Sequence, residues 1–277
     1  MESVSFHYGK KAPLFSGLSL DLEPDTIYGL LGKNGAGKTT LLKLMCGLLY
    51  ADGGSIDVFG YDPLLRRPEM LADLVLVPEE FATPAMTVEE YRALYSPLYP
   101  RFDGTQFAAY IGEFELDPSA KLSEMSYGQK KKVLLAFALA TNTRLLILDE
   151  PTNGLDIPSK GQLRRLLAGA ASPERIILVS THQVRDIEGL IDPIVVLDEG
   201  AVVFNQDLET VSGRLTAELV TEQPDPGTVL FSEQTMGGYA VVRESRDSEP
   251  SHVDVELLFN AIISKPQDIN RIFGEGE

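Results

Sequence analysis

The stretch "GLLGKNGAGKTT", residues 29–40, places four glycines ahead of a lysine and two threonines. From Gly32 to Thr39 it fits the pattern G-x-x-x-x-G-K-[ST], between a predicted strand and a predicted helix. Glycines let backbone N–H groups curl around phosphate oxygens, and the helix points its positive N-terminus at the same anion. We therefore predict a phosphate-binding loop, with Lys38 reaching the β- and γ-phosphates and Thr39 binding Mg²⁺.

A second signal is "LLILDEPTNGLD", residues 145–156, in which an apolar run delivers two acids to the end of a buried strand. Open α/β sheets bind ligands at the carboxyl ends of their strands. We expect Asp149 to bind Mg²⁺, directly or through water, and Glu150 to orient or deprotonate an attacking water. An apolar run ending in Asp-Glu is often only structural, but the phosphate loop upstream favours hydrolysis of a nucleoside triphosphate.

A third signal is "SEMSYGQKKK", residues 123–132, which ends in three lysines. Lys130, Lys131 and Lys132 fall in the first turn of a predicted helix, where cations oppose the helix dipole. This local conflict suggests that an anion docks there. The alternative is a solvated basic face.

The rest of the chain alternates strands with helices, which predicts an α/β fold with a largely parallel sheet. Helices are expected near residues 129–141 and 159–170, and a helical, aromatic-rich segment over 83–116. A strand is expected after the turn "DGG" at 52–54. Beyond about residue 215 we expect two strands about Gly237 and Gly238, a polar loop at 243–252, and a helix in "VELLFNAIIS" ended by Pro266.

The composition bounds the class of protein. The formal charge is −17 over 277 residues, which disfavours nucleic-acid binding, because such binding needs a basic face. The longest apolar run, Val133 to Ala140, is far shorter than the roughly 20 residues that cross a bilayer, and the chain opens without a leader pattern. We expect a cytoplasmic protein. A single cysteine, Cys46, excludes an internal disulfide framework and is expected to pack in a helix.

The phosphate loop, "MSYGQ" at 125–129, "LLILDE", "GLD" at 154–156 and "STHQ" at 180–183 occur in a characteristic order. Together they resemble the ATP-binding cassette of ABC transporters over roughly residues 1–215. The resemblance implies a P-loop NTPase of the ABC ATPase type, with an antiparallel β subdomain and a short helical subdomain at about 81–140. Residues 216–277 would form a small C-terminal α+β extension. In this family two cassettes meet head to tail and close over two ATP molecules.

The resemblance also assigns roles to residues. Tyr8 would stack on adenine, although a strand-core role is the alternative, and His182 would contact the γ-phosphate. Ser126 and Gly128 would touch the γ-phosphate bound by the opposite subunit, and Asp156 would lie between the cassettes. The predicted catalytic residues are Glu150, His182 and Lys38. The predicted nucleotide-binding residues are Tyr8, Gly32, Asn34, Gly35, Ala36, Gly37, Lys38, Thr39, Thr40, Ser126, Gly128, Gln129 and Asp156, and the predicted Mg²⁺ ligands are Thr39, Glu79 and Asp149.

Two positions depart from the family pattern. The signature is usually Leu-Ser-Gly-Gly-Gln, whereas Met125 and Tyr127 stand here for the leucine and the first glycine. The retained serine and second glycine still allow capping of a nucleotide. Glu79 stands where the family usually has a glutamine that contacts Mg²⁺. It adds a third acid beside Asp149 and Glu150, so we expect stronger metal dependence or a raised carboxylate pKa.

The resemblance implies an ATP-hydrolysing motor subunit that works with a second cassette, identical or different, and with a transmembrane permease at the inner face of the cell membrane. The short insertion of about 45 residues between Glu79 and Glu124, and "VPEE" at 77–80, favour an ABC-2-type exporter. We expect a cytoplasmic helix of the permease to dock among the apolar side chains that follow Glu79, although packing within the subdomain is the alternative. Those side chains are Phe81, Met86, Tyr91 and Tyr95.

Two other functions remain open. One is a soluble ABC-type ATPase that serves cluster assembly, repair or translation. A repair role is disfavoured because the chain has no long coiled-coil insertion, and a translation role because it has one cassette; cluster assembly stays open. The other is a degenerate cassette that binds without hydrolysing, which the presence of Lys38, Asp149, Glu150 and His182 disfavours.

Overall fold

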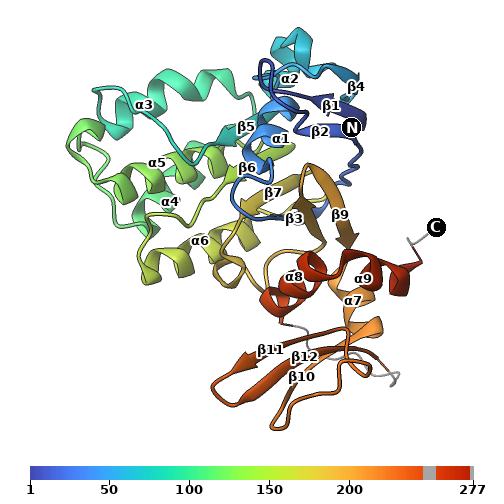
Figure 1. The fold of residues 1–277 in the computed structure, drawn as a ribbon. Helices are drawn as coiled ribbons and strands as arrows, with labels where there is room; N and C mark the ends of the chain where they lie inside the picture. The colour runs from blue at the N-terminus through green and yellow to red at the C-terminus, as the bar shows by residue number, and fades with distance from the viewer. Residues whose placement is uncertain (246–253, 275–277) are drawn as a thin grey trace.

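A six-stranded sheet of order β5-β6-β7-β3-β8-β9 runs through the molecule (Figure 1). The computed structural model describes residues 1–245 and 254–274. The first five strands in this order are parallel, and only β9 is antiparallel, which confirms the predicted α/β class. The strands are β3 (Thr26–Leu31), β5 (Leu74–Val77), β6 (Leu145–Asp149), β7 (Ile176–Thr181), β8 (Ile194–Asp198) and β9 (Ala201–Gln206).

The two faces of this sheet bury two separate hydrophobic clusters. Successive side chains of a strand point to opposite faces, so Leu30 joins one cluster and Leu31 joins the other. The first cluster is covered by α1 (Lys38–Met45), whose Leu41 and Leu42 are fully buried. The second is covered by two long helices, α5 (Tyr127–Ala140) and α6 (Ile157–Gly169). Because both faces are covered, β6 and β7 are buried along their whole length, as their continuous apolar runs predict.

A small antiparallel sheet of order β2-β1-β4 flanks α1 (Figure 1). Its strands are β1 (Glu2–Phe6), β2 (Phe15–Leu18) and β4 (Gly53–Ser55). The prediction that a strand follows the turn at 52–54 is wrong by a few residues, because the two glycines themselves form β4. Gly54 has φ of +81°, and a Cβ there would lie 2.3 Å from the carbonyl oxygen of Ser3, so a glycine is required at this close crossing.

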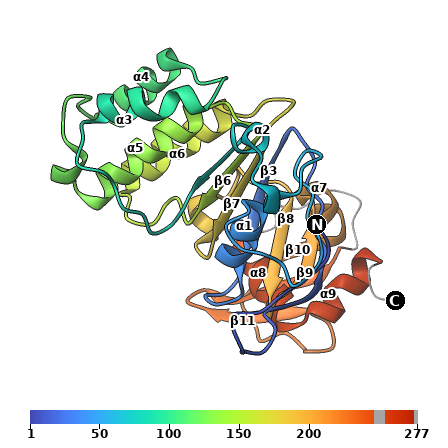
Figure 2. The same ribbon diagram turned by 90° about the horizontal axis from the view of Figure 1, so that it is seen from above.

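The helical subdomain projects from one side of the sheet (Figure 2) and packs its aromatic side chains on Phe137 of α5. It contains α3 (Val88–Tyr95) and α4 (Gly104–Glu113) besides α5. The predicted helical segment at 83–116 is therefore two short helices with a turn between them. The remaining short helical segments of the cassette are η1 (Pro63–Leu65), α2 (Pro68–Leu71), η2 (Ser96–Leu98), η3 (Leu122–Glu124) and η4 (Val184–Asp186).

The C-terminal segment forms a three-stranded antiparallel sheet of order β10-β12-β11, together with helices α7, α8 and α9. The predicted strand pair about Gly237 and Gly238 is confirmed, and so is the helix at 255–264. Pro266 does not only end that helix; it begins α9, because proline is well suited to the first helical position. The elements are α7 (Leu208–Arg214), β10 (Leu215–Val220), β11 (Phe231–Thr235), β12 (Gly238–Glu244), α8 (Val255–Ser264) and α9 (Pro266–Phe273).

This C-terminal segment shares its core with the cassette. Leu258 and Ile262 of α8 belong to the same hydrophobic cluster as Ile194 and Val196 of β8. The division of the chain at residues 215 and 216 thus stays a prediction. The predicted polar loop at 243–252 lies mostly outside the described residues. Across residues 1–245 and 254–274, no helix has both the length and the apolar character that a bilayer crossing requires.

Candidate nucleotide site

The phosphate loop connects β3 to α1, and two of its glycines are required by close approach. A Cβ on Gly32 would lie 2.5 Å from the carbonyl oxygen of Leu197. Gly37 has φ of +108°, and a Cβ there would lie 2.8 Å from the ring of Phe15. Only glycine adopts this backbone without strain. These glycines therefore let the loop pass close to its neighbours, so that the N-terminus of α1 points toward the carboxyl end of the sheet.

Lys38 is the cation at this position, and it is 7% exposed. Its Nζ donates to the carbonyl oxygen of Gly32 at 2.7 Å and lies 3.8 Å from Oε1 of Glu150. Burial lowers the pKa of Lys38, while the charges of Glu150, Asp149 and Glu79 oppose that shift. These contacts hold the ammonium group over the loop. A phosphate bound by the loop would lie close to it.

Thr39 and Asp149 converge as the predicted Mg²⁺ ligands require. Thr39 Oγ1 donates to Asp149 Oδ2 at 2.8 Å, and Ser180 donates to the other carboxylate oxygen. Mg²⁺ in nucleotide sites usually takes one or two protein oxygens and completes its shell with phosphate and water. A hydroxyl and a carboxylate in contact suit that donor set. Among the residues that the structure describes, no cluster of three or more acids, histidines or cysteines forms a self-sufficient metal cage.

Glu150 and His182 lie together at the ends of neighbouring strands. His182 Nδ1 is 2.8 Å from Glu150 Oε1, and Thr181 donates to Glu150 Oε2 at 3.2 Å. The side chain of Glu150 is buried, and its backbone has φ of +47°. Non-glycine residues in this left-handed region are uncommon and cluster at functional sites. The carboxylate is therefore held rigidly and faces the phosphate loop.

Glu79 lies two residues after the end of β5 and lines the same site. Its Oε1 accepts a hydrogen bond from Asn153 Nδ2 at 2.8 Å, and its carbonyl oxygen accepts one from the Tyr127 hydroxyl at 2.5 Å. The third acid predicted beside Asp149 and Glu150 is thus present, tied by Asn153, a residue that sequence reasoning did not single out. Its position in the turn after β6 was the available signal.

A cavity of about 570 Å³ opens among these groups. Tyr8 lies at its edge with 44% of its surface exposed, and its hydroxyl is 3.0 Å from Thr40 Oγ1. Its exposure argues against the strand-core alternative. Gly32 and Ala36 belong to the loop but are buried. The lining residues are Tyr8, Leu14, Asn34, Gly35, Gly37, Lys38, Thr39, Thr40, Glu79, Glu150 and His182.

Six predicted nucleotide contacts do not line this cavity: Gly32 and Ala36 of the loop, and four residues from α5 and the start of α6. Ser126, Gly128 and Gln129 lie at the start of α5, and Asp156 is the N-cap of α6, accepting from Ser159 N at 2.9 Å. The hydroxyl of Ser126 and the side chain of Gln129 form a reciprocal capping box. Ser126 and Asp156 are exposed, so a second molecule could reach them.

The three lysines of α5 do not form one basic face. Lys131 is 0% exposed, and its Nζ donates to the carbonyl oxygen of Glu150 at 2.8 Å. The predicted docking of an external anion is therefore wrong for Lys131. The conflict with the helix dipole is offset within the chain, by a carbonyl group and by the acids of the site. Lys132 instead lies with its Nζ 5.8 Å from the ring centre of Phe114.

The aromatic side chains proposed to receive a permease pack largely within the subdomain. Tyr91 and Tyr95 contact the ring of Phe137, and Phe81 stacks on Tyr127 with ring centres 5.0 Å apart. These contacts agree with the packing alternative. The large apolar side chains exposed nearby are Leu94 and Leu98, which sequence reasoning did not name.

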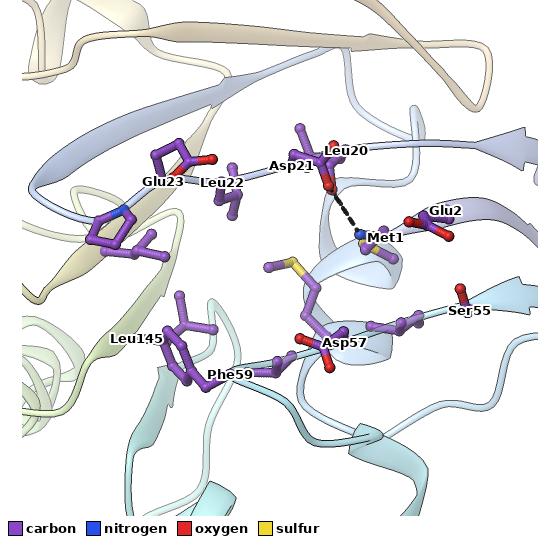
Figure 3. A pocket seen from close by; sticks show the side chains of 15 residues that line it. Met1, Glu2, Leu20, Asp21, Leu22, Glu23, Ser55, Asp57, Phe59 and Leu145 are labelled. Atoms are coloured by element: carbon purple, nitrogen blue, oxygen red, sulfur yellow. Dashed lines mark hydrogen bonds and ion pairs between the residues drawn. The ribbon is translucent and has the colours of Figure 1, made fainter.

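A second cavity, of about 550 Å³, lies at the opposite end of the sheet (Figure 3). Leu145 and Ile176, the first residues of β6 and β7, line it together with Phe59. Its rim carries acids, among them Asp21, which is 3.7 Å from the N-terminal ammonium group. No residue of the predicted site lines this cavity.

A glycine loop that opens onto a buried lysine, and acids that follow the neighbouring strands, define the class of P-loop nucleoside triphosphatases. A family model described as "ABC transporter" matches residues 15–153, about half of the chain. The chain belongs to this family.

Relatives and solved structures agree with this assignment. The chain is 31% identical to "ABC transporter ATP-binding protein YtrB" of Bacillus subtilis, over 69% of this chain and 66% of that protein. It is 34% identical to "Nod factor export ATP-binding protein I" of Burkholderia thailandensis, over 98% of this chain and 94% of that protein. A solved structure titled "Structure of ATP binding subunit of ABC transporter" superposes with a TM-score of 0.69 at 25% identity, over 76% of this chain and 90% of that one.

Proposed function

We propose that this chain binds and hydrolyses ATP as the motor subunit of an ABC transporter. Members of the family bind ATP and hydrolyse it. The observation that carries the proposal is the contact of Glu150 with both Lys38 and His182. This contact supports a role for Glu150 as the base beside the cation that would hold the terminal phosphate. The base for water attack and the phosphate anchor then lie within one cavity.

In the proposed reaction the protein positions groups rather than forming bonds itself. Lys38 neutralises charge on the β- and γ-phosphates. Glu150 orients the attacking water or accepts its proton, and His182 holds that carboxylate in place through their 2.8 Å contact. Tyr8 offers its exposed ring to the adenine. Thr39, Asp149 and Glu79 would hold Mg²⁺, which neutralises phosphate charge when bound.

The proposed active form is a dimer of cassettes, identical or different. Cassettes of this family are known as dimers. The exposed position of Ser126 and Asp156, away from the cavity of their own chain, supports contact with the nucleotide and surface of a second cassette. The tip formed by Ser126, Tyr127 and Gly128 would cap the phosphates of its partner. At that tip Tyr127 adds an exposed aromatic side chain where the family usually has a glycine.

The proposed partner in the membrane is a separate permease, and the proposed transport direction is export. One relative bears the name of an export protein and matches along 94% of its length. We propose that the permease docks on the helical subdomain near the exposed Leu94 and Leu98. The protein would then lie at the inner face of the membrane, with ATP-driven closure passed to the permease through that subdomain.

The test of hydrolysis is phosphate release by the purified chain with Mg-ATP, beside a Lys38→Ala variant. We expect turnover by the unaltered chain, and we expect the variant to lose affinity for a fluorescent ATP analogue, because the buried cation is gone. Absence of turnover in both the isolated chain and its native membrane complex would contradict the proposal. A pull-down from native membranes tests the partner: recovery of a polytopic protein supports transport. A soluble partner alone would instead favour a role in cluster assembly, repair or translation.

A further inference from the structure

Lys131 occupies a position that the proposed reaction does not yet use. It is fully buried at the start of α5, one helical turn after the exposed tip at Ser126. A buried lysine is rare unless it is paired, because removing an ammonium group from water is costly. Burial lowers the pKa of Lys131, and the charges of Glu79, Asp149 and Glu150 oppose the shift, with Glu79 first among them.

The contacts of Lys131 lead to the backbone of the proposed base. Its Nζ donates to the carbonyl oxygen of Glu150 at 2.8 Å, and the N–H of Asn153 donates to the same oxygen at 3.2 Å. Glu150 is the residue whose φ is +47°. A left-handed non-glycine residue persists only where its surroundings hold it. These two donors supply that support.

The same ammonium group lies beneath the segment that carries Glu79. Lys131 Nζ is 6.0 Å from the ring centre of Phe81 and 5.9 Å from that of Tyr127, and these two rings stack on each other. Tyr127 in turn donates to the carbonyl oxygen of Glu79. Asn153 links Glu79 to Glu150. Its side chain donates to the Glu79 carboxylate, and its backbone N–H donates to the carbonyl oxygen of Glu150.

We propose that Lys131 is a positioning residue for Glu150, holding its carbonyl group in the left-handed conformation and balancing the negative charge of Glu79. The charged groups that face it are the acids Glu79, Asp149 and Glu150, with Lys38 as the other cation of the site. Ser126 is the N-cap of α5, the helix that carries Lys131. A nucleotide that docks at Ser126 would therefore affect the position of Glu150 in the same chain. The inference rests on the proposed hydrolysis, which it deepens.

The test is a double-mutant cycle of Lys131→Met and Glu79→Gln, read by turnover at saturating Mg-ATP. Methionine keeps an unbranched side chain but cannot donate to Glu150. We expect Lys131→Met to lower kcat by about 10- to 100-fold, the effect of a misplaced reacting group. Its affinity for a fluorescent ATP analogue, measured with EDTA, should stay within about twofold, since Lys131 lies outside the cavity. In the Glu79→Gln background the same change should cost at least about fivefold less, because the charge to be balanced is gone.

The control is Lys121→Met, which removes an exposed lysine from the same subdomain and should leave turnover unchanged. The inference is overturned if folded Lys131→Met retains turnover within about twofold, or if the losses of the two single variants simply multiply. Thermal unfolding gives a second reading of the cycle. If Lys131→Met fails to fold, a double variant that unfolds cooperatively supports the charge balance, and an equally unfolded double variant overturns it. If the unaltered chain has no ATPase activity, the proposed function fails, while the thermal cycle still decides whether Lys131 and Glu79 are coupled.

Discussion

Two cavities of nearly equal volume lie at opposite ends of the same sheet, about 570 Å³ at the phosphate loop and about 550 Å³ beneath the first residues of β6 and β7. The first contains a buried lysine, a strained glutamate and glycines that allow close approach. The second is lined by apolar side chains such as Leu145 and by exposed acids such as Asp21 and Asp57 (Figure 3). Size therefore does not distinguish the two cavities, and neither does a left-handed backbone, since Phe59 of the second cavity has φ of +57°. The buried charge of Lys38 and Glu150 does distinguish them.

The directions of the strands explain this difference. In a parallel sheet all carboxyl ends meet at one edge, where the following loops bring their side chains together. Glu150 and His182 come directly after a strand, Glu79 comes one residue later, and the three meet at that edge. At the other edge the strands only begin, so the residues there are ordinary core residues such as Leu145. The asymmetry predicts opposite outcomes for substitutions at the two ends.

The largest expected effect is at the phosphate end. Glu150→Gln should lower kcat by about 10² to 10⁴, the range for loss of a general base, because the amide cannot accept the proton of the attacking water. Binding of ATP should persist, since Lys38 and the loop are unchanged. Single-turnover phosphate release and nucleotide titration measure the two quantities. Near-normal phosphate release would remove Glu150 from the proposed mechanism and with it the main contrast between the two cavities.

The matching change at the other end is Leu145→Ala. It should lower the free energy of unfolding by about 2–5 kcal/mol, because Leu145 is buried and its truncation enlarges the second cavity. Nucleotide affinity should be unchanged, since the phosphate loop lies at the opposite edge. Urea denaturation and ATP titration test this. A large loss of ATP affinity in a folded variant would show that the two ends are not independent.

A smaller effect separates strained from relaxed glycines. Gly37→Ala should destabilise the chain by about 1–2 kcal/mol, because φ of +108° disfavours a side chain and the new Cβ would meet Phe15. Gly112→Ala, within helix α4, meets nothing within 4 Å and should stabilise the chain by about 0.5–1 kcal/mol. Urea denaturation of both variants provides the comparison. Equal effects would indicate that the loop does not hold its left-handed conformation in solution.

The smallest effect concerns the far end of α1, where Cys46 is the C-cap beside Met45 of the second cavity. Burial raises the pKa of Cys46 from its ordinary value of 9.0 to about 12. A raised thiol pKa means that the folded state binds more protons, so its contribution to stability is full below pH 9 and is lost as pH rises toward 12. Alkylation of the native thiol should therefore be suppressed at pH 9, where the urea-unfolded chain reacts readily. Equal rates would place Cys46 at the surface.

Much of the site could be predicted because its signals are local. The glycine spacing before Lys38, and the acids after an apolar run, depend on neighbours along the chain. One error also has a local cause: Gly53 and Gly54 imitate a turn but form β4. Pro266 follows the end of α8 as predicted, and it also begins α9. Glycine fits a close crossing of strands as well as a turn, and proline fits the first position of a helix as well as the residues after a helix end.

The sequence by itself determined the phosphate loop, the parallel sheet and the acids at its edge, because loop conformation and strand burial follow from residue types at short spacing. Only the tertiary structure decided that Lys131 contacts Glu150, that Asn153 holds Glu79, and that the aromatic side chains near Tyr91 pack on Phe137. These contacts join residues far apart along the chain. Which of several polar or apolar groups meet there depends on how whole helices pack on the sheet, and no local pattern encodes that packing.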